Sequence, residues 1–133
     1  MSDAVTLTLR AAPPGPLDMD GVTPERCAGL GEREIAALDL WCGRERLALG
    51  ELFAVRGARA AELRLAGDLA LARGVGAGMR AGLLVVDGDA GDEAGRGMTG
   101  GEIEVRGDAG ADAAAYARRG VIAVAGTAGA GAA

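Results

Sequence analysis

The sequence contains no histidine, lysine, asparagine or glutamine, so all 14 of its basic residues are arginine. Without histidine, a Ser-His-Asp triad, a Cys-His pair and a conventional catalytic zinc site are excluded. Without lysine, a Walker-type phosphate loop is excluded as well. Cys27 and Cys42 lack CxxC spacing, and we interpret them as structural thiols in a reducing compartment. We therefore nominate no catalytic, cofactor-binding or metal-binding residue in this chain.

Aromatic residues and clusters of positive charge are also scarce. Trp41, Phe53 and Tyr116 are the only aromatic side chains among 133 residues, so a core must be built from small aliphatic side chains. The net charge of -5 and the scattered arginines argue against a nucleic-acid surface, which needs a basic patch. The N-terminal "MSDAVTLTLR" lacks an export-signal pattern, and no apolar run approaches the roughly 18 residues of a membrane helix. We expect a cytoplasmic protein that contacts neither nucleic acid nor membrane.

The sequence is rich in glycine, with 24 residues, and in the second half these recur with a period of nineteen. Residues 74–92, 93–111 and 112–130 read "GVGAGMRAGLLVVDGDAGD", "EAGRGMTGGEIEVRGDAGA" and "DAAAYARRGVIAVAGTAGA". Self-similarity at such a period indicates stacked structural units. The glycines that we expect to form the corners between short sides are Gly76, Gly78, Gly82, Gly88, Gly91, Gly95, Gly97, Gly101, Gly107, Gly110, Gly120, Gly126 and Gly129.

Aliphatic residues align between those glycines. In the middle repeat the residues between them are charged, which is the pattern of a half-buried strand whose alternate side chains point inward. Two methionines share a further column, where a flexible thioether fills irregular core space. The predicted core ladder consists of Leu84, Ile103 and Ile122, then Val86, Val105 and Val124, and finally Met79 and Met98.

A strand with two inward residues must stack on copies of itself to bury them. We therefore predict an all-β fold, a β-solenoid with rungs of about 19 residues. The stretch "AELRLAGDLA", in which Leu63 and Leu65 precede Gly67, is a degenerate first rung. We expect residues 57–133 to form the repeat domain and residues 1–56 to form a small strand and short-helix cap.

The N-terminal half has its own local signals. "VTLTLR" at 5–10 alternates as a strand, and "LFAVRG" at 52–57 indicates a strand leading into the repeats. Thr23, Pro24 and Glu25 predict a short helix that ends near Ala28, and "EREIAALDL" predicts a second helix. We expect both helices to cover the mouth of the solenoid, where an open strand edge would otherwise pair with other chains.

Two motifs invite a chemical interpretation, and in both the repeat explains the residues better. Gly95-x-Gly97-x-x-Gly100 spells the dinucleotide fingerprint, but a strand pattern follows it where the fingerprint requires a helix. Asp87, Asp89 and Asp92 lie close together, but their spacing matches neither an EF-hand loop nor a calcium-binding nonapeptide repeat. We assign these aspartates to turns and solvation.

Taken together, "LTLR", "GVTPERCAGLGEREIAALDL", "GELFAVRG" and the glycine rungs resemble the C subunit of formylmethanofuran dehydrogenase and of the bacterial formyltransferase/hydrolase complex. The resemblance implies a right-handed, single-stranded β-helix that acts as a non-catalytic scaffold in one-carbon metabolism, where the complex handles a formyl group on methanofuran. It also implies that molybdenum or tungsten pterin, iron–sulfur and zinc chemistry belongs to sister subunits. The glycine rungs, which include Gly74-x-Gly76-x-Gly78, also resemble the GXGXG domain of the glutamate synthase large subunit.

The third repeat departs from the family pattern, because Ala114, Tyr116 and Ala117 replace the expected Gly, Gly and Met. The family also continues through further rungs, so we expect either a truncated C-terminus or a frayed tail. Apolar residues replace charges along the outer edge, and we expect Leu83, Val85 and Val121 to dock a sister subunit. A glutamate-synthase-like oxidoreductase domain and a general protein-interaction module remain the alternatives.

Overall fold

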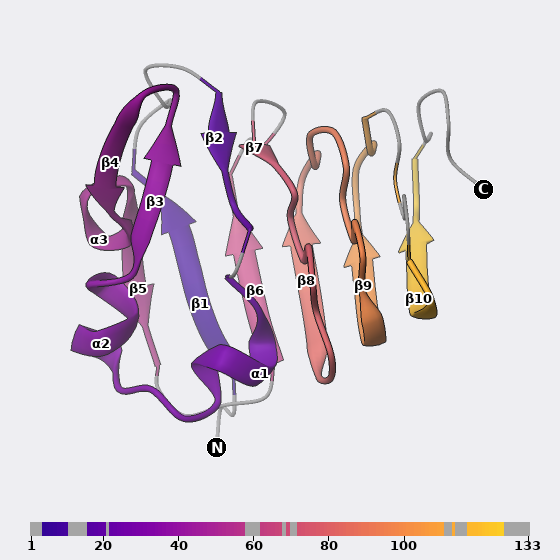
Figure 1. The fold of residues 1–133 in the computed structure, drawn as a ribbon, viewed down its shortest axis with the longest axis horizontal. Helices are drawn as coiled ribbons and strands as arrows, with labels where there is room; N and C mark the ends of the chain where they lie inside the picture. Colours follow the sequence, from indigo (N-terminus) through magenta and orange to yellow (C-terminus); the bar gives the residue numbers. More distant parts are fainter. Residues whose placement is uncertain are drawn as a thin grey trace.

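The computed structural model describes residues 4–10, 16–20, 22–57, 62–67, 69, 72–110, 113 and 117–126. Two sheets and three short helices make up this part of the chain (Figure 1). The six-stranded sheet has the order β10 (Arg119–Val124), β9 (Thr99–Val105), β8 (Leu83–Asp87), β6 (Glu62–Ala66), β1 (Ala4–Leu9) and β5 (Phe53–Arg56). The four-stranded sheet has the order β4 (Glu45–Ala48), β3 (Asp39–Cys42), β2 (Leu17–Asp18) and β7 (Ala72–Arg73). The helices are α1 (Pro24–Cys27), α2 (Glu32–Ala36) and α3 (Leu49–Leu52).

Strands β6, β8, β9 and β10 are parallel neighbours, and Figure 1 shows them side by side from the middle of the molecule to its C-terminal end. Leu84 is paired with Ile103, and Ile103 with Ile122, so this column runs across three successive repeats. Each repeat therefore buries its inward side chains against the next one, because a strand this short cannot bury them alone. We call these four strands the parallel ladder.

The chain reverses between ladder strands at positions that require glycine. Gly76 has φ 75° and Gly95 has φ 71°, in the left-handed region that other residues rarely adopt. A Cβ at Gly76 would collide with Cδ1 of Ile103, and a Cβ at Gly95 would collide with Cδ1 of Ile122. The isoleucine of each following repeat therefore occupies the space that the missing side chain leaves.

The prediction of an all-β, right-handed single-stranded β-helix is wrong. Strand β5 is antiparallel to β1, and β3 is antiparallel to both β2 and β4, so parallel and antiparallel pairing are mixed and helices are present. The chain is an α/β fold. The nineteen-residue repeat could not reveal this, because it accounts only for the ladder and carries no signal for the strands formed by residues 17–48.

The N-terminal half forms part of the same core as the ladder. Strand β1 lies parallel to β6, and its Val5 and Leu7 are paired with Leu63 and Leu65. One continuous hydrophobic cluster includes buried residues of both halves, namely Val5, Leu7, Leu17, Ile35, Leu40, Phe53, Leu63, Leu65, Leu84, Val86, Ile103 and Val105. The N-terminal segments thus share the hydrophobic interior of the ladder in addition to covering its end.

The local N-terminal predictions succeed in part. "VTLTLR" forms β1 and "LFAVRG" supplies β5. Helix α1 begins at Pro24, but Thr23 makes no capping bond to the backbone and its Oγ1 donates to the carboxylate of Glu25 instead. Helix α2 ends at Ala36, earlier than predicted, because Asp39–Cys42 joins the second sheet as β3.

Candidate functional site

The predicted corner glycines divide into two kinds by backbone conformation. Eight of them have positive φ: Gly76, Gly78, Gly82, Gly88, Gly95, Gly97, Gly101 and Gly120. Gly107, Gly110 and Gly126 lie outside that region, and a Cβ at each would collide with Oδ1 of an aspartate in the preceding repeat. Gly91 is buried, also without a positive φ, while Gly129 lies outside the described residues. Some corners therefore need glycine for its backbone freedom and others for its lack of a side chain.

The aspartates of the corners join successive repeats. The backbone N–H of Asp108 donates to Oδ1 of Asp89 at 2.8 Å, and Nη1 of Arg106 lies 2.7 Å from Oδ1 of Asp87. Both pairs are nineteen residues apart. Asp89 therefore accepts a hydrogen bond from the next repeat. Turn chemistry predicts a bond to a backbone amide near Asp89 instead. In the part of the chain that the structure describes, no three Asp, Glu, Cys or His side chains are placed to hold a metal ion.

The predicted core ladder lies inside the molecule, except at its C-terminal end. Met79, Leu84, Val86, Met98, Ile103 and Val105 are at most 1% exposed. Ile122 and Val124 are only partly buried, because no described strand pairs with β10 on its other side. The glycine fingerprint Gly95–Gly100 leads into β9, so the local structure there is a strand and no helix N-terminus faces a nucleotide site.

The three residues of the predicted partner edge do not form one exposed surface. Val121 is 56% exposed, Leu83 is half-buried, and Val85 is only 1% exposed. The prediction that Val85 belongs to a docking edge is therefore wrong, because its side chain is buried within this chain. Nearby, helix α1 contacts β6, which is the strand beside β8, and the N–H of Arg80 donates to Oε1 of Glu25 at 3.0 Å.

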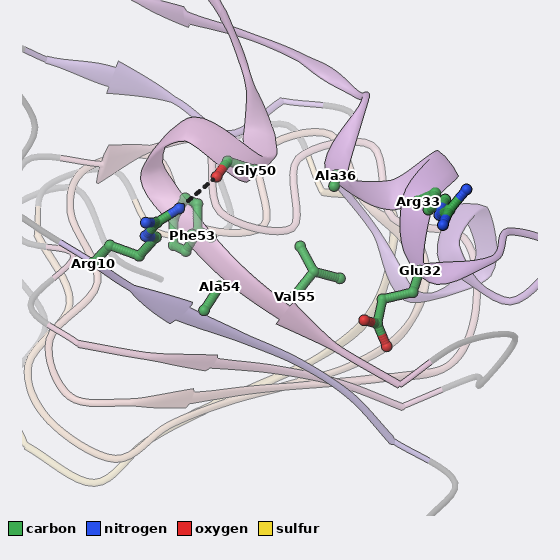
Figure 2. Close-up of a pocket in the computed structure, with 8 residues that line it drawn as sticks. All are labelled: Arg10, Glu32, Arg33, Ala36, Gly50, Phe53, Ala54 and Val55. Atoms are coloured by element: carbon green, nitrogen blue, oxygen red, sulfur yellow. Dashed lines mark hydrogen bonds between the residues drawn. The ribbon is translucent and has the colours of Figure 1, made fainter.

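A shallow hollow of about 240 Å³ lies between α2 and the edge strand β5. Figure 2 shows Arg10 at one end of it and Glu32 with Arg33 at the other, with apolar residues between them. Nη1 of Arg10 donates to the carbonyl of Gly50 at 3.3 Å, and the N–H of Gly57 donates to Oε2 of Glu32 at 3.2 Å. No sequence pattern indicated this hollow, because its walls come from segments that are distant in the chain.

The chemistry of this hollow is that of a binding surface. Its described walls combine the charged side chains of two arginines and one glutamate with alanine, glycine, valine and phenylalanine. The apolar middle can hold an apolar side chain, while the guanidinium groups at the two ends can attract a carboxylate. It is therefore a candidate contact point for another molecule.

Both cysteines are buried, and they are not joined in a disulfide. Desolvation by burial raises the pKa of the Cys27 thiol to about 11, although nearby Arg26 acts in the opposite direction. The reactive form of cysteine is the thiolate, so Cys27 is inert near neutral pH. No helix in the described ranges is long and apolar enough to cross a membrane.

The fold and these surfaces define a class of protein: an α/β chain built around a parallel ladder with glycine at its corners. No protein-family model matches the chain. The C subunit of molybdenum-containing formylmethanofuran dehydrogenase 1 from Methanothermobacter thermautotrophicus is 34% identical over 82 residues, which are 60% of this chain and 20% of that protein. The Methanosarcina barkeri counterpart is 37% identical over 80 residues, which are 56% of this chain and 27% of that protein.

A solved structure extends this similarity to the fold. The crystal structure of the formyltransferase/hydrolase complex FhcABCD from Methylorubrum extorquens, in complex with methylofuran, contains a chain that matches with a TM-score of 0.83 and 34% identity. The match covers 93% of this chain and 47% of that chain. The resemblance to the C subunit that was predicted from the sequence is confirmed. This chain spans about half of the matched structure and, at 20%, a smaller share of the first relative. The similarity to a GXGXG domain stays a prediction.

The relatives are described as molybdenum-containing, so the fit of such a group to this chain can be tested. Its described residues offer no cluster of three candidate metal ligands, and its two thiols are buried singly. This donor set does not fit a metal centre. We therefore derive no chemistry in this chain from such a group.

Proposed function

We propose that this chain is a scaffold protein, equivalent to the C subunit, in a formylmethanofuran dehydrogenase or formyltransferase/hydrolase complex of one-carbon metabolism. The observation that carries the proposal is the structural match to the FhcABCD complex, with a TM-score of 0.83 over 93% of this chain. Identity of 34% over that range supports more than a shared fold. In this proposal the chain contributes no catalytic group, and the metal and pterin chemistry belongs to sister subunits.

The physical character of the molecule supports a scaffold. The ladder is bonded from one repeat to the next along its strands and also at its corners, for example from the N–H of Gly107 to the carbonyl of Gly88 at 2.9 Å. Its interior is a continuous aliphatic core. A framework bonded in this way holds its surface side chains in fixed relative positions, which lowers the entropic cost of docking a partner.

Strand β10 is the docking edge in this proposal. Its outward side chains Val121 and Ala123 are exposed, whereas their partners in β9 are Glu102 and Glu104. An apolar edge strand readily pairs with another chain. Val121 is therefore the residue of the predicted partner edge that remains available to a sister subunit.

The test is co-purification. We would co-produce the tagged chain with the candidate formyltransferase and hydrolase subunits of such a complex, and compare Val121→Arg with Ala37→Arg as a matched control. Ala37 is an exposed alanine that directly follows α2, at the opposite end of the molecule from β10 (Figure 1). We expect the wild type and Ala37→Arg to recover both partners and Val121→Arg to lose at least tenfold. Recovery of the wild-type chain alone would contradict the proposal.

A second measurement separates the scaffold from an oxidoreductase domain. Trp41 is the single tryptophan, so its fluorescence can be followed without interference from a second indole. We expect titration with FMN or NAD to leave this fluorescence unchanged. Saturable quenching would favour the glutamate-synthase-like alternative.

A further inference from the structure

A row of four exposed side chains crosses the second sheet. The strand register places Arg46 opposite Trp41, Trp41 opposite Asp18, and Asp18 opposite Arg73. Their strand neighbours Leu17, Leu40 and Cys42 point to the other face and are buried, so the four side chains share the solvent face. We call this set the outer row.

Trp41 is the unusual member of the outer row. It is the only tryptophan in the chain and is 51% exposed, and among the described residues only Val121 is another large hydrophobic side chain this exposed. Tryptophan and arginine are the residues most enriched where protein interfaces concentrate their binding energy. A hollow of about 230 Å³, lined by Pro16, Asp18, Trp41, Gly43 and Arg73, lies beside the indole and leaves room for another ring.

The order of charges in the outer row makes it complementary to itself. Arg46 lies one strand from Trp41 on one side, and Asp18 lies one strand away on the other, at spacings of about 4.8 Å. A two-fold axis parallel to β3, lying above Trp41 on the solvent side of the sheet, would bring the two indoles together and would place each Arg46 opposite Asp18 of the second copy. Both ion pairs then form at once, as a symmetric interface requires.

The neighbouring groups are compatible with this arrangement. The N–H of Asp20 donates to Oδ1 of Asp18 at 3.0 Å, which orients the carboxylate. Arg73 already has an ion-pair partner within the chain, Glu93 at 2.7 Å, which it shares with Arg96. Offset stacking of aromatic rings adds to the two ion pairs.

We propose that the outer row is a self-association interface and that the chain forms a two-fold symmetric dimer through Trp41. This inference is independent of the proposed function. The row is short compared with a standard interface, so dissociation in the micromolar range is expected, on the order of 10 μM. Because the indole becomes buried, its emission shifts to shorter wavelength as the dimer forms.

Sedimentation velocity of the 133-residue chain between about 1 and 300 μM tests the proposal, with Trp41 emission recorded over the same range. We expect the wild type to pass from monomer to dimer. Trp41→Ala, Arg46→Asp and Asp18→Arg should each weaken association at least tenfold, and circular dichroism checks that each variant is folded. The double variant Arg46→Asp with Asp18→Arg should recover the dimer, because both ion pairs re-form with reversed sign.

The control is Val121→Asp, which changes the other exposed hydrophobic residue and should leave the dimer intact. A wild type that stays monomeric at the highest concentration overturns the proposal. So does a dimer that survives Trp41→Ala but is lost in Val121→Asp, because β10 would then be the interface. If the double variant does not recover association, Arg46 does not face Asp18 of the second copy, and the proposed dimer is contradicted.

Discussion

The backbone N–H of Asp108 donates a hydrogen bond to Oδ1 of Asp89 at 2.8 Å, nineteen residues earlier in the chain. This bond replaces a local turn interaction with one between successive repeats. Gly107 lies against the same carboxylate oxygen, where a Cβ would collide with it. Asp89 and Gly107, eighteen residues apart in the sequence, therefore join the corners of two successive repeats.

Removal of this hydrogen bond should lower the free energy of unfolding moderately. Asp89→Ala leaves the amide of Asp108 to water, because the site is exposed, and should lower the free energy of unfolding by about 1 kcal/mol. Asp89→Asn keeps a carbonyl acceptor and should lose less than half of that. Urea unfolding of both variants measures the difference. Equal losses would mean that the bond from Asp108 contributes nothing beyond the negative charge.

Two isoleucines in the same core column differ in burial, so we expect their replacement to lower the free energy of unfolding by different amounts. Ile103 is 1% exposed in β9, whereas Ile122 is only partly buried in β10. Ile103→Ala should lower the free energy of unfolding by about 3 kcal/mol, and Ile122→Ala by about 1 kcal/mol. Chemical denaturation of the two variants compares them directly. Losses of the same size would show that Ile122 is as deeply buried as Ile103, and would contradict an open edge at β10.

Cys27 provides a prediction about pH. Its pKa is raised from the ordinary value of 9.0 to about 11 in the folded protein, so between these two values the folded chain binds more protons than the unfolded chain. Stability contributed by the neutral thiol is therefore complete below pH 9 and is lost as pH rises through about 11. The loss should be on the order of 2 kcal/mol.

Cys27→Ala removes this dependence on pH, and unfolding of both proteins between pH 8 and pH 11, at about unit steps, measures it. The native wild type should also resist a thiol reagent at pH 7.5 and react only on unfolding, because thiolate is scarce at about that pH. Rapid labelling of folded protein at Cys27 would contradict burial of the thiol.

The parts of the structure that could be predicted are those whose signal is local and repeated. Alternation at Leu84 and Val86, together with the same pattern nineteen residues later, is enough to place two strands in register. The glycine fingerprint was correctly assigned to a strand boundary, because the residues from Thr99 to Val105 alternate with the period of a strand. The resemblance to the C subunit followed from longer motifs in both halves.

The parts that could not be predicted depend on long-range contacts. Strand β2 has only two residues and pairs with partners on either side that are far away in sequence. Val85 is buried although it alternates with core residues in β8, and nothing near it in the sequence indicates this. The outer row brings together Asp18, Trp41 and Arg73 from three separate segments, so each looked like an ordinary surface residue in the sequence.

Stacking of consecutive repeats in register is most directly tested at Gly76 and Gly78. They have nearly the same backbone conformation, with φ 75° and 73°, but a Cβ at Gly76 would strike Cδ1 of Ile103 whereas a Cβ at Gly78 would meet nothing within 4 Å. Gly78→Ala should therefore lower the free energy of unfolding by about 1 kcal/mol, from backbone strain alone. Gly76→Ala should cost about 3 kcal/mol, because overpacking is added.

A double-mutant cycle with Ile103→Val then isolates the contact, because valine lacks the Cδ1 atom that a Cβ at Gly76 would strike. We expect Ile103→Val to reduce the cost of Gly76→Ala by at least about 1 kcal/mol and to leave the cost of Gly78→Ala unchanged. Equal costs for the two alanine variants, with no coupling to Ile103, would contradict the stacking of one nineteen-residue repeat on the next.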